Sequence, residues 1–329
     1  MIDPYLRNIS YLRLSVTDRC DLRCTYCMPE DNKFLPKTNI LSLEEIERLA
    51  TVFIKKGIKK IRITGGEPLV RKNVIQLFNN LGKFLKTRDL DELTLTTNAT
   101  QLSKFAKPLF ESGVRRINVS LDSLNPDKIN LITRKNKFDS IMKGIFSAAE
   151  SGMKIKINAV ALKGINDNDF EKMLHWCGQN KFDLTLIETM PMGNIGYSRN
   201  KNYISVTEVI NKLEKKFHFE KSSLDTGGPA KYLKVKEYNI KLGLITPMSH
   251  NFCSLCNRIR VTCTGKLYMC LGQNNFVDLK LPMRGSKSNN LLEKTIDNAI
   301  NKKPFGHDFS ITPNFESDYL KRTMNVTGG

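Results

Sequence analysis

Strand-like segments alternate with helix-like segments along the first 190 residues of this 329-residue chain. The expected strands cover residues 10–17, 59–64, 92–98, 115–122, 154–161 and 183–190. The expected helices between them cover residues 43–56, 73–86, 101–112, 138–151 and 168–180. Such alternation is typical of parallel βα units, and six units fall short of the eight in a closed barrel. The sequence therefore predicts an α/β fold built on an open, partial (βα)6 barrel of the TIM type.

Several helix ends carry recognisable signals. Ser42 followed by Glu45 predicts a capping box at the start of the first helix. Gly57 predicts its C-terminal stop, and Gly113 and Gly152 mark the ends of later helices in the same way.

The first five expected strands each have one polar and one apolar face, because side chains alternate across a strand. The polar faces consist of Arg13, Ser15 and Thr17; Lys60, Arg62 and Thr64; Thr94, Thr96 and Asn98; Asn118, Ser120 and Asp122; Lys154, Lys156 and Asn158. Helices cover the apolar face of a parallel sheet, so the polar face is expected to line the barrel interior. A packed barrel would carry Val, Ile and Leu there. A large polar ligand inside the barrel is therefore expected. The segment 183–190 fits this alternation poorly.

The pattern changes near residue 200. An expected helix at 205–217, again opened by Ser205 with Glu208, precedes strands near 231–237, 239–246, 258–263 and 266–271 and a helix near 290–302. We interpret residues 1–200 as the barrel and residues 201–329 as an α+β extension that caps its open mouth. The polar end of the chain, from Asn325, is expected to be flexible unless something docks it.

Two groups of three cysteines lie about 230 residues apart: Cys20, Cys24 and Cys27, then Cys253, Cys256 and Cys270. Four-iron clusters are usually held by four thiolates, so three leave one iron open to bind another molecule. A zinc site completed by a further residue is the alternative. No histidine lies near Cys20, but His250 lies three residues before Cys253, so zinc stays open for the second group.

Two cysteines are left over. Cys177, beside Trp176 in an expected helix, is interpreted as an inert core thiol. Cys263 is expected to be a strand residue, with a cluster-ligand role as the alternative.

The net charge is +19, from 52 Lys and Arg against 33 Asp and Glu. Many of these cations are expected simply to be solvated, but the excess also favours an anionic partner. No zinc-finger spacing, aromatic RNA-binding motif or arginine-rich arm is present, so a nucleoside triphosphate is preferred to nucleic acid. No apolar run is long enough to span a bilayer and no signal-peptide core is present. A cytoplasmic protein without a membrane partner is expected.

The motifs that carry a family resemblance are Arg13, the first cysteine group, Thr64-Gly-Gly-Glu-Pro68, Thr96-Thr-Asn98, Asn118-Val-Ser-Leu-Asp122, Lys156-Ile-Asn158, Ile187-Glu-Thr-Met190, Cys253-x2-Cys256-Asn-Arg-Ile-Arg260, Cys270 and Gly328-Gly329. They cover nearly the whole chain. The sequence resembles the radical S-adenosylmethionine (SAM) superfamily and, more closely, the GTP 3′,8-cyclase family of molybdenum-cofactor biosynthesis.

The resemblance implies two four-iron clusters. In that family the first binds SAM, whose reductive cleavage gives a 5′-deoxyadenosyl radical. The second binds the purine of GTP. The radical removes a hydrogen from the ribose C3′, and C3′ then bonds to C8 of guanine. By position, the resemblance assigns SAM contacts to Tyr26, Gly66, Ser120 and Met190.

The resemblance also assigns GTP contacts. Its triphosphate arginines correspond to Arg13, Arg258 and Arg260, and its further nucleotide contacts to Arg62, Thr96, Lys156 and Ile259. Lys60 beside Arg62 is a further candidate. The Gly-Gly tail of the family reaches the active site, which makes Gly328 and Gly329 catalytic candidates with the three triphosphate arginines.

Two positions depart from the family pattern: Thr185 stands where an arginine is usual, and Ala99 where glycine is frequent. The family also suggests a homodimer, a flavodoxin or ferredoxin as reductant, and a downstream cyclic pyranopterin monophosphate synthase. The alternatives are a peptide-modifying radical SAM enzyme with an auxiliary cluster, and an RNA-binding protein with two structural zinc sites.

Overall fold

The computed structural model describes residues 1–193, 195, 199–224, 228–249, 253–307, 309, 320 and 322–328. Its first six strands are β1 (Tyr11–Ser15), β2 (Lys60–Thr64), β3 (Glu92–Thr97), β4 (Arg116–Ser120), β5 (Lys154–Val160) and β6 (Asp183–Ile187). The later strands are β7 (Phe219–Lys221), β8 (Lys231–Val235), β9 (Ile240–Ile245), β10 (Arg258–Val261), β11 (Lys266–Tyr268) and β12 (Phe276–Asp278).

The helices of the first half are α1 (Leu43–Lys55), α2 (Val74–Lys86), α3 (Leu102–Glu111), α4 (Pro126–Thr133), α5 (Phe138–Glu150) and α6 (Phe170–Gln179). Those of the second half are α7 (Arg199–Asn202), α8 (Val206–Leu213), α9 (Lys280–Arg284), α10 (Asn290–Ile300) and α11 (Met324–Thr327). Short 3-10 helices occur at Lys37–Asn39, Pro68–Val70 and Cys253–Leu255.

Strands β1 to β6 are neighbours in chain order, and each is parallel to the next. This confirms the predicted succession of βα units. Helix α4 was not predicted, although Asn125 caps it by accepting from two backbone N–H groups and Pro126 occupies its first turn.

The predicted helix signals are confirmed. Ser42 and Glu45 form a complete capping box at the start of α1. Gly57, Gly113 and Gly152 all have positive φ, which glycine adopts without the steric cost of a Cβ atom. Ser205 accepts a hydrogen bond from the backbone of Glu208 and so caps α8.

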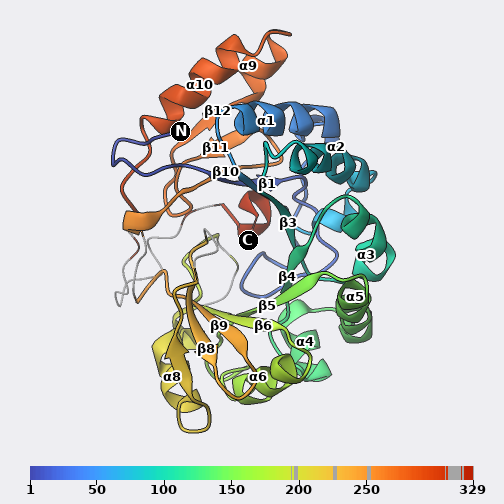
Figure 1. The fold of residues 1–329 in the computed structure, drawn as a ribbon, viewed down its shortest axis with the longest axis vertical. Coiled ribbons are helices and arrows are strands. Elements are labelled where there is room, and N and C mark those ends of the chain that lie inside the picture. Colours follow the sequence, from blue (N-terminus) through green and yellow to red (C-terminus); the bar gives the residue numbers. More distant parts are fainter. Residues whose placement is uncertain are drawn as a thin grey trace.

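Helices α1, α2, α3, α5 and α6 lie along one side of the sheet, and α11 lies on the other, near the middle of the molecule (Figure 1). The apolar strand faces, represented by Leu12, Ile61, Leu95, Val119 and Ile157, are fully buried in the core. The polar faces therefore point to the side opposite the helices, as the alternation predicted.

The C-terminal strands join the sheet of β1 to β6 instead of forming a separate layer. β10 pairs in parallel with β1, and β9 pairs in parallel with β6, so the C-terminal strands continue the sheet at both edges. The order is β12-β11-β10-β1-β2-β3-β4-β5-β6-β9-β8-β7. The edges of a six-stranded sheet present unpaired backbone groups, which these strands cover. Sequence periodicity carries no information on this pairing.

Within the described ranges, none of the helices combines the length and apolar character needed to cross a membrane.

Candidate active site

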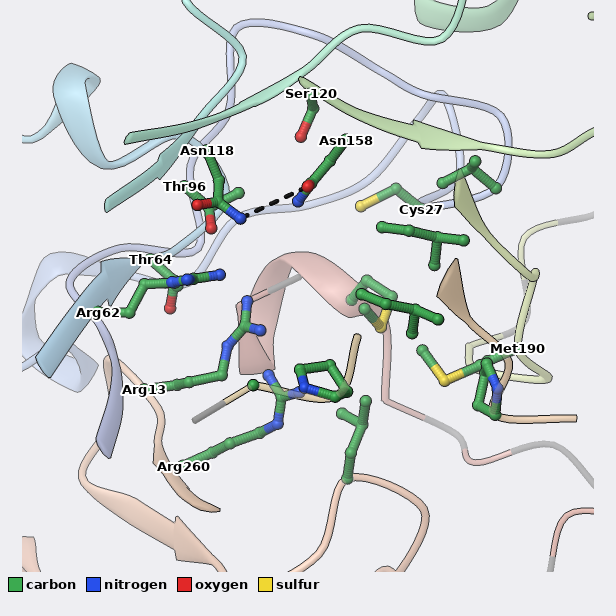
Figure 2. A pocket seen from close by; sticks show the side chains of 18 of the residues that line it. Arg13, Cys27, Arg62, Thr64, Thr96, Asn118, Ser120, Asn158, Met190 and Arg260 are labelled. Atoms are coloured by element: carbon green, nitrogen blue, oxygen red, sulfur yellow. Dashed lines mark hydrogen bonds between the residues drawn. The ribbon is translucent and has the colours of Figure 1, made fainter. Parts of the chain in front are cut away.

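A cavity opens on the polar side of the sheet. Its wall includes all six cysteines of the two groups, together with polar side chains of β1 to β5, residues of the extension and residues of α11. In Figure 2, Arg13, Arg62 and Arg260 lie on one side of this cavity and Cys27 and Met190 on the other. The structure thus brings the two cysteine groups and the predicted arginines to one chamber.

Strand register places three arginines side by side. Arg13 of β1 pairs with Arg260 of β10 and with Arg62 of β2, so the three side chains form a row across adjacent strands. Arg258 precedes this row on β10 and also lines the cavity. Arg13 and Arg62 are buried and Arg260 is partly buried, so the row concentrates positive charge that suits an anionic ligand.

The electrostatics of this row are unfavourable without such a ligand. Burial lowers the pKa of Arg13 to about 10, against the opposing effect of Tyr11, and Arg62 and Arg258 lower it further. Burial also lowers the pKa of Arg260 well below its usual range, and Arg13 and Arg258 contribute. Desolvation and like-charge repulsion disfavour the charged forms, and the negative charge of a bound phosphate group would offset both effects.

Several buried polar atoms of the cavity wall make no hydrogen bond among the described residues. In the described part of the chain, no hydrogen-bond partner is found for the buried Arg62 Nε, Thr64 Oγ1, Thr96 Oγ1 and Asn118 Oδ1. Figure 2 shows these four side chains together, with the 3.4 Å hydrogen bond from Asn118 Nδ2 to Asn158 Oδ1. Buried polar groups are normally satisfied, so this surface fits a polar ligand.

Lys156 lines the same cavity, and its Nζ donates a 2.6 Å hydrogen bond to the hydroxyl oxygen of Tyr232. Burial lowers the pKa of Lys156 well below its ordinary value, with Arg62, Arg116 and Lys60 adding repulsion. Tyr232 was not predicted from the sequence, because its strand lies in the extension and its role depends on the fold.

Two predicted contacts lie elsewhere. Lys60 does not line the cavity and pairs with Glu92 at 2.8 Å. The side chain of Ile259 is 1% exposed and belongs to the apolar core, because alternation on β10 turns it away from Arg258 and Arg260. Neither side chain therefore lines the cavity in this structure.

The first cysteine group lies in the loop after β1. This loop is anchored to the end of α4, where Arg23 N donates to Thr133 O and Thr25 N donates to Ile132 O. Burial raises the pKa of the Cys20 and Cys24 thiols. Thiolates at such a place need a compensating positive charge, which metal ions supply.

Among the described residues, no three His, Cys, Asp or Glu side chains are close enough to hold one metal ion. A mononuclear zinc site needs its ligands around a single centre. The thiolates of a four-iron cluster bind different irons of a cube, so they lie farther apart. Both cysteine triplets face the cavity. His250, the alternative zinc ligand, lies outside the described residues.

The second cysteine group is held by two buried cations. Nη1 of Arg7 donates 2.6 Å hydrogen bonds to the carbonyl oxygens of Cys253 and Phe305. Nζ of Lys303 lies 3.6 Å from Sγ of Cys256, and Lys303 is 2% exposed. Burial alone would raise the pKa of Cys256, but Arg258 and Lys303 lower it to about 7. A lowered pKa favours the thiolate form of Cys256, which is the form that binds metal ions.

The predicted SAM residues Tyr26, Gly66, Ser120 and Met190 all line the cavity. The hydroxyl of Tyr26 donates a 2.8 Å hydrogen bond to Asp122 Oδ2. A Cβ atom on Gly66 would lie 2.3 Å from the carbonyl oxygen of Arg19. Gly66 is therefore already required by close packing of its turn against the loop that follows β1.

Glu67, beside Gly66, was not given a role by the sequence. It is fully buried and accepts hydrogen bonds from Leu69 N, Thr97 Oγ1 and Asn98 N. Burial raises its pKa to about 7, against the effect of these donors. Glu67 thus ties the glycine turn to the turn after β3, which positions the cavity wall.

The end of the chain is packed into the cavity wall. Asn325 is 2% exposed and lines the cavity, and its Nδ2 donates to the carbonyl oxygen of Asp18 at 2.9 Å. Gly328 is buried against Thr64 and Arg260. The end of the chain from Asn325 was expected to be flexible unless something docks it, and these contacts dock residues 325–328. Gly329 lies outside the described residues.

The structure also locates the two remaining cysteines and the two positions that depart from the family pattern. Cys177 is fully buried in α6, as expected for a core thiol. Cys263 is buried in the turn after β10, not in a strand, and does not line the cavity. Thr185 is fully buried on β6. Ala99 has φ +65°, a conformation that glycine adopts without strain.

Comparison with known proteins decides the family. Over its full length the chain is 54% identical to a GTP 3′,8-cyclase from Mesorhizobium japonicum, of which it covers 99%. It is 52% identical to a GTP 3′,8-cyclase from Brucella ovis, of which it covers 96%. The chain belongs to the GTP 3′,8-cyclase family. Residues 14–177 match the model of the Radical SAM superfamily, and residues 182–309 match that of Molybdenum Cofactor Synthesis C.

A solved structure supports the fold of this family member. Streptococcus suis SuiB bound to S-adenosylmethionine superposes with a TM-score of 0.60 at 18% identity over 83% of this chain. The chain spans 64% of the length of SuiB, and the likeness supports the radical SAM fold, which is TIM-like. The family uses SAM and iron–sulfur clusters, and the six cavity-lining cysteines are consistent with two four-iron clusters.

Proposed function

We propose that this protein is a GTP 3′,8-cyclase, a radical SAM lyase that catalyses the first step of molybdenum-cofactor biosynthesis. The observation that carries the proposal is the row formed by Arg62, Arg13 and Arg260 in the same cavity as both cysteine groups. A nucleoside triphosphate is a multiply charged anion whose phosphate oxygens suit forked guanidinium groups. The row thus supports a triphosphate site within reach of two metal centres.

The chain's own residues bind and orient. We assign Cys20, Cys24 and Cys27 to the cluster that holds SAM, and Cys253, Cys256 and Cys270 to the cluster that holds the purine of GTP. When bound, the clusters supply an electron and open iron positions, and SAM supplies the 5′-deoxyadenosyl radical that removes the ribose C3′ hydrogen.

We assign the triphosphate to Arg13, Arg258 and Arg260. Arg62, Thr96 and Lys156 would bind the rest of the nucleotide, and the unsatisfied atoms of Arg62 and Thr96 support this role. Tyr26, Gly66, Ser120 and Met190, which all line the cavity, would hold SAM. Gly328 and Gly329 would place the tail beside the nucleotide.

The finer architecture belongs to the same proposal. Residues 1–200 would form the partial (βα)6 barrel, and residues 201–329 would cap its mouth with the second cluster. The cavity wall supports this, because it combines barrel residues such as Arg62 with extension residues such as Cys270. A homodimer in the cytoplasm, a flavodoxin or ferredoxin as reductant, and a downstream cyclic pyranopterin monophosphate synthase follow from the family resemblance.

An anaerobic preparation tests the metal content and the activity together. We expect about eight irons per chain and absorption typical of four-iron clusters. With SAM, a reductant and GTP, we expect 5′-deoxyadenosine whose formation depends on GTP, together with the 3′,8-cyclised nucleotide. A colourless zinc protein would contradict the enzyme. GTP-independent 5′-deoxyadenosine without a cyclised product would point instead to a different radical SAM reaction.

A further inference from the structure

Tyr232 reaches the cavity from outside the first six strands. It belongs to β8, which is separated from β5 in the sheet by β9 and β6. Its hydroxyl oxygen nevertheless accepts the 2.6 Å hydrogen bond from Nζ of Lys156, and that ammonium lies 5.1 Å from the centre of the Tyr232 ring. The contact therefore spans two intervening strands.

The intervening strands leave room for this contact. Register places Thr185 of β6 opposite Gly243 of β9, and Gly243 opposite Tyr232 of β8, so the three form a row across the sheet. A Cβ atom on Gly243 would lie 3.0 Å from Cε1 of Tyr232 and 2.7 Å from Oγ1 of Thr185. The tyrosine ring thus packs over a position where any side chain would crowd it. A long side chain at position 185 would compete for the same space.

Lys156 needs such a partner. Its four-carbon stem is flexible, and fixing it in one geometry costs side-chain entropy. The cations Arg62, Arg116 and Lys60 repel its charge, and Asp183 opposes them. A hydroxyl oxygen aimed at the ammonium holds it without neutralising it, which keeps the charge for an anionic ligand.

We propose that Tyr232 is a positioning residue that fixes the ammonium of Lys156 for contact with the nucleotide, in a slot opened by Thr185 and Gly243. The inference rests on the proposed role of Lys156 in GTP binding. It assigns to the extension a direct part in shaping the nucleotide site, beyond carrying the second cysteine group.

The test is Tyr232→Phe, which keeps the ring and removes only the hydroxyl. In the reconstituted protein without reductant, we expect GTP to bind about tenfold more weakly by calorimetry, as for loss of a hydrogen bond to a charged group. SAM affinity should stay unchanged, and kcat at saturating GTP should change much less than KM. Unchanged GTP affinity in Tyr232→Phe would overturn the proposal.

Tyr238→Phe is the matched control. Tyr238 belongs to the same extension, but its hydroxyl contacts Nδ1 of His175 at 2.5 Å and does not line the cavity. This variant should bind GTP like the wild type, and an equal loss in it would show a non-specific effect and overturn the proposal.

Gly243→Ala provides an independent arm, because the added methyl group crowds the Tyr232 ring while the hydroxyl remains. We expect weaker GTP binding in this variant as well. Wild-type affinity would contradict the claim that the Tyr232 ring needs the space left by Gly243. Thermal unfolding of each variant separates a loss of fold from a loss of binding.

Lys156→Met tests the assumption on which the proposal rests, namely that Lys156 contacts GTP. Wild-type GTP affinity in that variant would show that the lysine does not contact the nucleotide. A wild-type protein that does not cyclise GTP would refute the proposed function itself.

Discussion

Nη1 of Arg260 donates a 2.7 Å hydrogen bond to the carbonyl oxygen of Gly328. The two residues lie 68 positions apart in the chain, and the contact joins β10 to the segment that follows α11. Arg260 also stands in the row with Arg13 and Arg62. The guanidinium that we assign to the triphosphate thus also holds the end of the chain in the cavity wall.

This relationship makes Gly328 sensitive to substitution. In Gly328→Ala the new Cβ would lie 2.1 Å from Oγ1 of Thr64, at φ +76°. Strain of this kind costs about 1–3 kcal/mol, enough to displace the tail. We expect cyclisation to fall while iron content stays at the wild-type value, as measured by product formation and iron analysis.

Gly164→Ala is the control for that variant. Gly164 has nearly the same φ, +74°, but nothing lies within 4 Å of an added Cβ. It should retain full cyclisation. Full activity in Gly328→Ala would instead show that the packed tail has no role in the reaction.

Arg258→Ala should weaken GTP binding and leave SAM binding intact. Loss of charged hydrogen bonds of about 1.5–3 kcal/mol corresponds to roughly a ten- to hundredfold rise in Kd. Equilibrium binding of both ligands measures the two effects separately. Arg284→Ala serves as the control. It removes an exposed arginine that pairs with Glu45 and should leave the affinities for GTP and SAM unchanged. Equal GTP affinity in wild type and Arg258→Ala would exclude Arg258 from the triphosphate site.

GTP binding should depend on pH through Lys156. Burial, followed by Arg62, Arg116 and Lys60, lowers the pKa of this lysine well below 10.5 in the free protein. Bound triphosphate favours the charged form and raises that pKa again, so binding takes up protons. Affinity should be highest below the pKa of the free protein and should fall as pH rises toward the higher pKa of the complex.

The pH experiment is best done above about pH 7.5, where the terminal phosphate is fully ionised. Calorimetry in buffers of different ionisation enthalpy measures proton uptake directly. Lys156→Met should abolish the part of the uptake that the lysine causes. The same pH profile in wild type and variant would contradict this assignment.

Lys303→Met should alter the second metal centre without removing it. Nζ of Lys303 approaches Sγ of Cys256 and also bonds the carbonyl oxygen of Met269. Hydrogen bonds and positive charge near cluster sulfurs favour the reduced form, so their loss should make the reduction potential more negative. A spectroscopically monitored redox titration, with iron analysis, measures this. Lys302→Met, at the exposed neighbouring residue, is the control and should leave the potential unchanged. An unaltered potential in Lys303→Met would show that Lys303 does not influence the cluster.

Much of the first half of the fold follows from the sequence because its signals are local. The alternation of polar and apolar residues marked both faces of the first five strands, and Ser42, Glu45 and Gly57 marked the limits of α1. The cysteine spacing identified both groups of three, which line one cavity. Arg13 and Arg62 were predicted on the cavity face, because a strand's period of two determines which side chains share a face.

The tertiary structure decided what depends on contacts between distant segments. The pairing of β10 with β1 puts Arg260 beside Arg13, and no local pattern specifies that register. The docking of Gly328 and the approach of Lys303 to Cys256 likewise need segments far apart in the chain. Tyr232 carried no signal at all, since its place opposite Lys156 exists only after four strands have assembled side by side. Periodicity determines which face a residue takes, whereas the neighbour it meets there is determined by strand order and packing.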